Sequence, residues 1–234
     1  MESVAIITAR GGSKRIPRKN IKEFLGKPII AYSIEAALAA GCFNEVMVST
    51  DDDEIAEAAL KYGATIPFMR SHETADDYST TADVITEVLN RFAESDKKFS
   101  TACCIYPTAP FITGEKLRSA YQLLKEKECD CVIPVTEFSF PIRRSLKLDD
   151  DNLVSFNWPE FALTRSQDLE KAYHDCGQFY FLQVERFLQS QKLITGNTAA
   201  VIMPNTEVQD IDNEEDWKLA ELKYAFLLKN LIAH

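Results

Sequence analysis

The sequence predicts an α/β protein with a Rossmann-like, doubly wound and mostly parallel sheet. Two observations predict it. Short apolar runs alternate with segments of helical period, and a glycine-rich loop directly follows the first apolar run. Such alternation is typical of parallel strands whose crossover helices cover both faces of a sheet. At 234 residues the chain has the length of one such domain, and we expect a single domain over residues 1–234.

The elements can be placed in order along the chain. Apolar runs predict buried strands, and segments with apolar residues three to four apart predict helices. Gly41 and Gly63 follow two of the helical segments, where glycine favours a helix end. Up to position 135 the strands are expected at 4–8, 45–49, 101–106 and 131–135, and the helices at 28–40, 52–62, 81–92 and 115–126.

The alternation breaks at residues 136–174, which are rich in aromatic and charged side chains. This segment predicts a β-hairpin arm with its turn at 149–152, because aspartate and asparagine favour tight turns. We expect the arm to pack on a second copy of the chain, and packing on its own domain is the alternative, since a free arm exposes aromatic surface. Strands at 178–182 and 199–202 and a helix at 214–231 should complete the fold.

The composition argues against several classes of function. A formal net charge of −10 disfavours binding to DNA or RNA, so any anionic ligand must be held by a local group of cations. The six cysteines include no CxxC pair, which indicates free, mostly buried thiols. No basic segment followed by a long apolar stretch opens the chain, so we expect no signal peptide and no membrane span, and a cytoplasmic protein.

A group of cations lies in the loop after the first predicted strand. Glycines there let backbone N–H groups approach an anion, at the end of the sheet where doubly wound folds bind ligands. The loop therefore predicts a polyphosphate site, although a solvated basic loop is the alternative on charge alone, and neither the GxxxxGK[ST] nor the GxGxxG spacing is present. The cations are Arg10, Lys14, Arg15, Arg18 and Lys19, set around Gly11, Gly12 and Ser13.

Residues 9–20 (ARGGSKRIPRKN) closely resemble the ARGGSKxIPxKN loop of the CMP-sialic acid synthetase, or acylneuraminate cytidylyltransferase, family, whose members activate nonulosonic acids with CTP. The resemblance continues at 48–51, 107–110 and 209–212 and spans most of the chain. It implies a fold of the nucleotide-diphospho-sugar transferase type, a homodimer, and CTP and an acidic nine-carbon sugar as substrates.

Within that family, the segments 68–77, 106–111 and 164–180 look most like the members that activate pseudaminic acid. The sialic acid enzymes usually show Gln-Pro-Thr-Ser-Pro where this chain has Tyr-Pro-Thr-Ala-Pro at 106–110. Pseudaminic acid is therefore the expected acceptor, with legionaminic and N-acetylneuraminic acid as alternatives. Enzymes for the eight-carbon sugar Kdo ordinarily lack the Gly-Ser-Lys arrangement seen at 12–14.

The resemblance also implies the nucleotide contacts. Arg10, Lys14 and Lys19 are the expected catalytic groups, because cations stabilise the leaving pyrophosphate. Arg70 is suited to donate to pyrimidine O2 and N3, which would reject UTP, while a surface arginine is its alternative. The expected nucleotide-binding set is Ala9, Arg10, Gly12, Ser13, Lys14, Asn20, Arg70, Ala75, Asp76 and Asp77.

Asp210 and Asp212 flank one apolar residue. If their segment is extended, its period of two places both carboxylates on one face, where they can bind Mg²⁺ together with waters and phosphate. From the residues alone, Asp212 can equally cap the following helix. The family's metal carboxylates match both positions, so the resemblance implies a magnesium site.

Arg165 is the first candidate for the sugar carboxylate, because arginine binds carboxylates with two parallel hydrogen bonds. In the family a further cation reaches across from the neighbouring subunit's arm, and Arg143 stands at the matching place. Thr108, Gln178 and Tyr180 are expected to line the sugar pocket, with a core aromatic as the alternative for Tyr180.

Two other classes of function are disfavoured. A non-catalytic nucleotide-binding dimer should lack a phosphate cation or a metal carboxylate, and none is missing from the matched positions. A dinucleotide-dependent oxidoreductase should carry GxGxxG after its first strand, and this chain does not.

Overall fold

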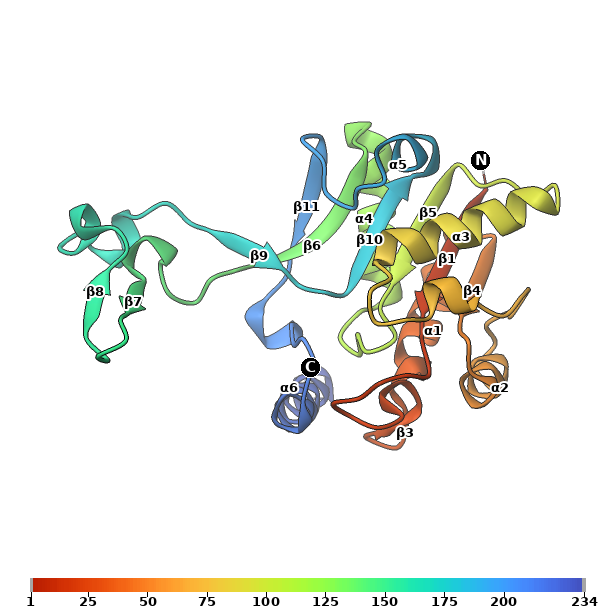
Figure 1. Ribbon diagram of the computed structural model, residues 1–234, viewed down its shortest axis with the longest axis horizontal. Coiled ribbons are helices and arrows are strands. Elements are labelled where there is room, and N and C mark those ends of the chain that lie inside the picture. Colours follow the sequence, from red (N-terminus) through yellow and green to blue (C-terminus); the bar gives the residue numbers. More distant parts are fainter. Residues whose placement is uncertain (1, 233–234) are drawn as a thin grey trace.

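A seven-stranded sheet forms the centre of the structure, a computed structural model that describes residues 2–232 (Figure 1). The strand order is β11-β6-β10-β5-β1-β4, and β9 pairs with β6 at one end. The strands are β1 (Ser3–Thr8), β4 (Glu45–Ser49), β5 (Thr101–Ile105), β6 (Cys131–Glu137), β9 (Tyr173–Asp175), β10 (Phe179–Gln183) and β11 (Thr198–Ile202). The strands expected from the sequence are all present, and β9 is additional.

The sheet is mostly parallel, as predicted. β1 pairs in parallel with β4 and with β5, and β11 pairs in parallel with β6. β10 runs antiparallel between β5 and β6. Its residues are buried on both faces, so their apolar character predicts a central strand without indicating its direction.

Helices cover both faces of the sheet. The helices α1, α2 and α4 share one buried cluster with the sheet, and α3 and α5 share another, so the fold is doubly wound. The sequence predicts all of them except α5, which has only seven residues. Their bounds are α1 (Ile29–Ala40), α2 (Asp53–Lys61), α3 (Thr81–Glu94), α4 (Gly114–Lys127), α5 (Val184–Ser190) and α6 (Glu214–Ile232).

The winding of the chain reverses between β1 and β5. From β1 the chain passes to β4 on one side, and it then crosses back to place β5 on the other side of β1. Connections therefore leave the carboxyl ends of these two neighbours in opposite directions. In doubly wound sheets a crevice opens at such a point, and ligands bind there.

The C-terminal helix closes the carboxyl end of the sheet. A third buried cluster joins Trp217 of α6 to Phe24, from the short β2–β3 hairpin (Glu23–Phe24 and Lys27–Pro28), and to Ile16 of the glycine-rich loop. Ile211, which lies between the two aspartates of interest, belongs to the same cluster. Packing thus holds the segment before α6 against the glycine-rich loop.

The segment predicted as an arm projects away from the sheet (Figure 1). Its hairpin consists of β7 (Leu146–Leu148) and β8 (Val154–Phe156), joined at the predicted turn, where Asp149 Oδ1 accepts hydrogen bonds from two backbone N–H groups. The ends of the predicted range differ, because residues 136–137 and 173–174 pair with each other in the sheet.

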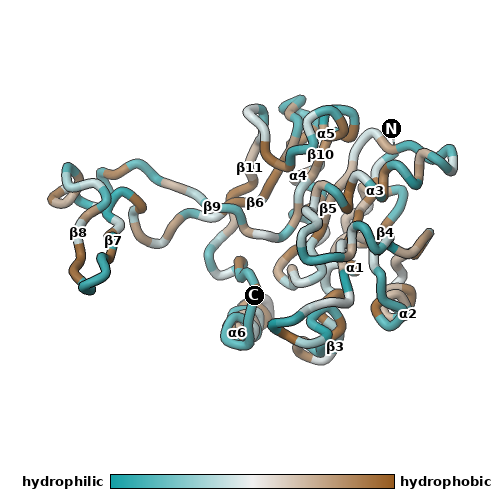
Figure 2. The backbone as a smooth tube through the Cα atoms, in the orientation of Figure 1, coloured by the Kyte–Doolittle hydropathy of each residue, from teal (hydrophilic) through white to brown (hydrophobic). Residues whose placement is uncertain are grey.

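Figure 2 shows apolar stretches along this arm, among polar ones. Its most exposed apolar side chain, Leu163, is 99% exposed, and Phe140 is 84% exposed. Elsewhere the chain meets the expectations from composition: all six cysteines are free and five are buried. No helix among residues 2–232 is long and apolar enough to cross a membrane.

Candidate active site

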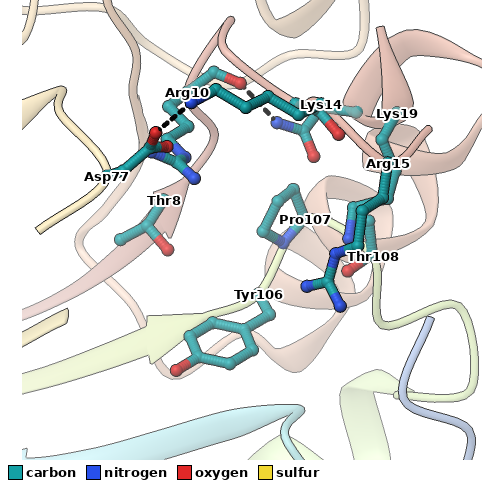
Figure 3. A pocket seen from close by; sticks show the side chains of 11 residues that line it. Thr8, Arg10, Lys14, Arg15, Lys19, Asp77, Tyr106, Pro107 and Thr108 are labelled. Atoms are coloured by element: carbon teal, nitrogen blue, oxygen red, sulfur yellow. Dashed lines mark hydrogen bonds and ion pairs between the residues drawn. The ribbon is translucent and has the colours of Figure 1, made fainter. Parts of the chain in front are cut away.

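A cleft of about 440 Å³ opens at the carboxyl ends of β1 and β5, where the winding reverses (Figure 3). One wall comes from the glycine-rich loop after β1 and includes five of the predicted site residues. The opposite wall comes from Tyr106, Pro107 and Thr108, which follow β5. The loop residues that line the cleft are Arg10, Ser13, Lys14, Arg15, Lys19 and Asn20.

Carboxylates and amides from other elements hold the loop in shape. Asn20 is buried, and its Nδ2 donates a hydrogen bond of 2.9 Å to the Arg10 carbonyl. Asp51, after β4, accepts the Gly11 N–H at 2.9 Å, and Asp52 binds both terminal nitrogens of Arg18 at 2.5 and 2.9 Å. Sequence reasoning did not assign these roles to Asp51 and Asp52.

The glycine-rich loop passes close to Asp52 at Gly11. A Cβ on Gly11 would lie 2.7 Å from Asp52 Oδ2 and 3.0 Å from its Cβ, so any other residue would displace the side chain that binds Arg18. Gly12, in contrast, faces open space. Ala9 is buried, and its N–H donates to the Ser49 carbonyl at 3.0 Å, which fixes the start of the loop.

Asp77 forms ion pairs with two of the loop's cations. Arg10 Nη1 donates to Asp77 Oδ1 at 2.7 Å and to the Asp76 carbonyl at 2.8 Å, and Lys14 forms an ion pair with the same Asp77 carboxylate. Hydrogen bonds from Lys14 and Arg10 lower the pKa of Asp77. A triphosphate bound by Arg10 and Lys14 must therefore displace an ionised carboxylate.

Asp76 has a local structural role in this structure. Its Oδ1 accepts hydrogen bonds from the Tyr78 N–H and from the N–H and hydroxyl of Ser79, at 2.6 to 3.0 Å. Ala75 ends the short η2 helix (His72–Thr74) just before it. Both residues thus shape the loop that presents Asp77.

A second cavity of about 200 Å³ shares Thr8, Arg10 and Asp77 with the cleft, and Arg70 lines it. Arg70 is only 8% exposed, which overturns the alternative of a surface arginine. Its Nε donates to Ser49 Oγ at 3.0 Å and its Nη2 to the Ser49 carbonyl at 2.6 Å. Nη1 has no hydrogen-bond partner among residues 2–232, so it remains available to a ligand.

Asp210 and Asp212 lie outside the strands, in a loop between η6 (Asn205–Glu207) and α6. The loop nevertheless reaches the cations. Asp212 Oδ1 accepts from Arg15 Nη2 at 2.7 Å, and Lys19 Nζ donates to the Ile211 carbonyl at 2.6 Å.

The alternative that Asp212 caps the following helix is wrong. Asn213 Oδ1 accepts the N–H groups of Glu215 and Asp216 at 2.8 and 3.0 Å, so Asn213 caps α6. The Asp212 carboxylate is left to face Arg15 and Lys19.

The electrostatics of Asp210 and Asp212 favour a bound cation. Burial, followed by repulsion from Asp212, raises the pKa of Asp210, while burial lowers the pKa of Lys19. Among residues 2–232 no group of three or more His, Cys, Asp or Glu side chains is arranged to hold a metal ion. Two carboxylates beside a cluster of cations fit Mg²⁺, which takes one or two carboxylates together with substrate phosphates.

Two of the expected sugar ligands lie behind the cleft wall. The Gln178 carbonyl accepts the Tyr106 N–H at 2.9 Å, and Gln178 Oε1 is buried without a partner among the described residues. Tyr180 is a buried aromatic in β10, packed 5.6 Å from the Tyr106 ring, and its hydroxyl donates to Asp175 at 2.6 Å. Tyr106, rather than Tyr180, lines the cleft.

The two arginines that are candidates for binding the sugar's carboxylate lie in the arm. Arg143 pairs with Glu170 at 2.6 Å and lies over the Phe161 ring, and Arg165 pairs with Asp168 at 2.7 Å. Neither residue lines the cleft of its own chain. A single chain therefore brings the phosphate and metal candidates together without these two arginines.

Comparisons with known proteins point to one family. A family model described as Cytidylyltransferase matches residues 4–227. A pseudaminic acid cytidylyltransferase of Campylobacter jejuni is 41% identical, over 96% of this chain and 97% of its own. A CMP-N,N'-diacetyllegionaminic acid synthase of Legionella pneumophila is 33% identical, over 94% of this chain and 95% of its own.

Solved structures show the same fold. A CMP:2-keto-3-deoxy-manno-octonic acid synthetase in complex with CTP superposes with a TM-score of 0.67. The alignment covers 98% of this chain and all of that one (100%), at 17% identity. At that identity the likeness establishes the architecture alone.

Proposed function

This chain belongs to the cytidylyltransferase family, and we propose that it transfers CMP from CTP to the anomeric hydroxyl of pseudaminic acid and releases pyrophosphate. One observation carries the proposal. Two cations that line the cleft also hold the Asp210–Asp212 segment, because Arg15 pairs with Asp212 and Lys19 donates to the Ile211 carbonyl. In-line attack of a sugar oxygen on the α-phosphorus needs this combination and no covalent enzyme intermediate.

The loop is proposed to hold the triphosphate. Arg10 and Lys14 exchange Asp77 for phosphate oxygens, and Ser13 offers its hydroxyl and N–H from the same wall. Lys19 faces the acidic pair and, with Lys14, stabilises charge on the departing pyrophosphate. These cations lie where an anionic substrate can replace their carboxylate partners.

Arg70 is proposed to read the base. Nη1 donates into the second cavity, where cytosine presents acceptors at O2 and N3. Uracil presents N3–H instead, so the same donor would face another donor, and UTP is disfavoured.

Asp210 and Asp212 are proposed to hold Mg²⁺. When bound there, the ion neutralises charge on the phosphates during attack. Asp212 must then release Arg15, which becomes free to contact the nucleotide. The general base that accepts the sugar's hydroxyl proton is assigned to no side chain.

The sugar carboxylate is proposed to be bound by the arm of a second subunit. Arg143 and Arg165 carry the cations, and the arm that bears them projects from its own domain with exposed apolar side chains. A homodimer that buries this surface would place the arginines at the partner's cleft. Thr108 and Tyr106 line the wall that meets the acceptor sugar.

The proposal is tested by incubating the full-length chain with CTP, Mg²⁺ and a panel of nonulosonic acids. Pyrophosphate release and the mass of the CMP-sugar are followed, with UTP as the matched control. Pseudaminic acid should give the highest kcat/KM. Faster turnover of legionaminic or N-acetylneuraminic acid would replace the proposed acceptor, and CTP binding without turnover of any acid would favour a non-catalytic nucleotide-binding dimer.

A further inference from the structure

Glu87, in the middle of α3, accepts three hydrogen bonds from the turn that follows Arg70. Its Oε1 accepts the Ser71 N–H at 2.9 Å, and its Oε2 accepts the Ser71 hydroxyl at 3.1 Å and the Thr74 hydroxyl. The Glu87 side chain is only 14% exposed. A largely buried carboxylate thus binds both ends of η2, the element that leads into the Ala75–Asp77 loop.

Arg70 is fixed on its other side by β4 and the residue after it. The Arg70 N–H donates to the Thr50 carbonyl at 2.8 Å, and two guanidinium nitrogens bind Ser49. Glu87 accepts hydrogen bonds from the next residue, Ser71. The backbone of Arg70 is therefore held from both directions, and its side chain lines the second cavity.

Glu87 also bears on the charge of Arg70. The buried guanidinium forms no ion pair with a carboxylate within the described chain, and its charge is offset at longer range, first by Asp51 and then by Glu87. Hydrogen bonds from Thr74 and Ser71 outweigh burial and lower the pKa of Glu87, so it is ionised at neutral pH. Its charge favours retaining a buried cation beside the cavity.

We propose that Glu87 is a positioning residue for nucleobase selection: it holds the turn that aims Arg70, and through Arg70 it favours cytosine over uracil. The inference rests on the proposed role of Arg70 as the residue that reads the base. Glu87 itself lines neither the cleft nor the second cavity. It therefore acts without touching the nucleotide.

A purely structural role for the same contacts makes a different prediction. Arg91, one turn further along α3, also holds this segment through the Met69 carbonyl at 2.6 Å and lies over the Phe68 ring. If Glu87 only added another such clamp, its loss would lower stability and weaken CTP and UTP binding equally. Selectivity between the two nucleotides separates these roles.

The test compares Glu87→Gln with Glu94→Gln in the full-length chain. Glu94 ends the same helix and is exposed, and its side chain has no hydrogen bond or ion pair in the described chain. Because glutamine keeps the shape but loses the charge and part of the acceptor capacity, the CTP/UTP ratio of kcat/KM should fall about 10-fold in Glu87→Gln. The value of kcat at saturating CTP should stay within about 2-fold, because the phosphate and metal candidates are unaffected.

Calorimetric titration of CTP and UTP without acceptor sugar gives a second readout. A fall in CTP affinity with unchanged UTP affinity supports the proposal, and equal falls or an unchanged ratio overturn it. Wild-type protein that fails to prefer CTP would instead overturn the proposed function. Wild-type preference that survives Glu87→Gln removes the role of Glu87 alone.

A double-mutant cycle shows whether the effect passes through Arg70. On an Arg70→Lys background, Glu87→Gln should cause no further loss of selectivity, because the aimed donor is already altered. Additive losses would mean that Glu87 acts by another route. Glu87→Gln is isosteric and Arg70→Lys keeps the positive charge, which limits the risk of misfolding that circular dichroism and Tm would report.

Discussion

The glycine-rich loop and the arm both carry cations proposed for the active site, but their partners differ. In the loop, Arg15 pairs with a residue 197 positions away and Arg10 with one 67 positions away. In the arm, Arg165 pairs with a residue three positions away and Arg143 with one 27 positions away, also within the arm. The loop is therefore tied to the domain core, whereas the arginines of the arm are paired only within the arm.

This difference indicates what one chain can do alone. The proposed phosphate and metal half of the site is assembled by contacts within the chain, and packing around Ile16 and Ile211 supports it. The arm is left with exposed apolar side chains and with two arginines that do not line the cleft of their own chain. A second chain is the partner that would complete both.

Removing either of the two proposed metal carboxylates should have the largest effect. Asp210→Asn and Asp212→Asn should each lower kcat about 1000-fold, because the phosphates lose their counter-ion during attack. The measurement is steady-state pyrophosphate release, and Tm should hardly change. Glu215→Gln, an acidic neighbour in the first turn of α6, is the matched control and should keep its activity. Rates near wild type in both aspartate variants would exclude the metal role.

An arm that serves the partner's cleft should allow two defective chains to complement each other. Arg143→Ala alone should raise KM for the sugar about 10-fold to 100-fold, through loss of a charged hydrogen bond. A mixed dimer of Arg143→Ala and Asp210→Asn chains has one site with neither defect. Purified by two different tags, it should recover about half of the wild-type activity.

Assayed at a sugar concentration well below KM, the mixed dimer separates the two arrangements, because the opposite arrangement gives no recovery. If each arm served its own chain, every site in the mixed dimer would keep one defect. Repeating the assay with Arg165→Ala would show whether that arginine follows the same rule.

The smallest expected effect concerns the loop's anchor. Asp52→Asn should lower the free energy of unfolding by about 1 kcal/mol at neutral pH, because asparagine still caps α2 but loses the ion pair with Arg18. The hydrogen bond from Arg18 lowers the pKa of Asp52 in the folded state. Its contribution is therefore full above the unfolded pKa and is lost as pH falls through the folded pKa.

Urea unfolding at neutral and at acidic pH measures this difference, which should shrink in acid. Glu54→Gln is the control, because Glu54 binds the same Arg18 from an exposed position and should contribute less. A difference that grew in acid would contradict the assignment.

Much of the fold could be predicted because local patterns of apolar residues and glycines indicate its strands and helices. The buried runs at β1 and β5 and the glycine after α1 lie where periodicity predicts them. The direction of β10 could not be predicted, since a strand buried on both faces has the same composition either way. The brief α5 has too few turns for a clear periodic signal.

The candidate site divides in the same way. The loop cations and the two aspartates carry a motif, so the sequence indicates them. The roles of Asp51, Asp52 and Glu87 could not be predicted, because their side chains meet distant groups only after folding. Asp51 lies in the matched segment 48–51, but the run of aspartates at 51–53 is equally typical of a helix start, which it also is.

The contact of Asp77 with Arg10 and Lys14 has a consequence for the small anions that share a cell with any nucleotide. A carboxylate that belongs to the same chain competes at a high local concentration, so orthophosphate, with a single point of attachment, would bind weakly to these cations. A longer ligand that is also bound through its base and through a metal ion could offset the cost of displacing Asp77. The number of simultaneous contacts, rather than charge alone, would then decide which anion binds.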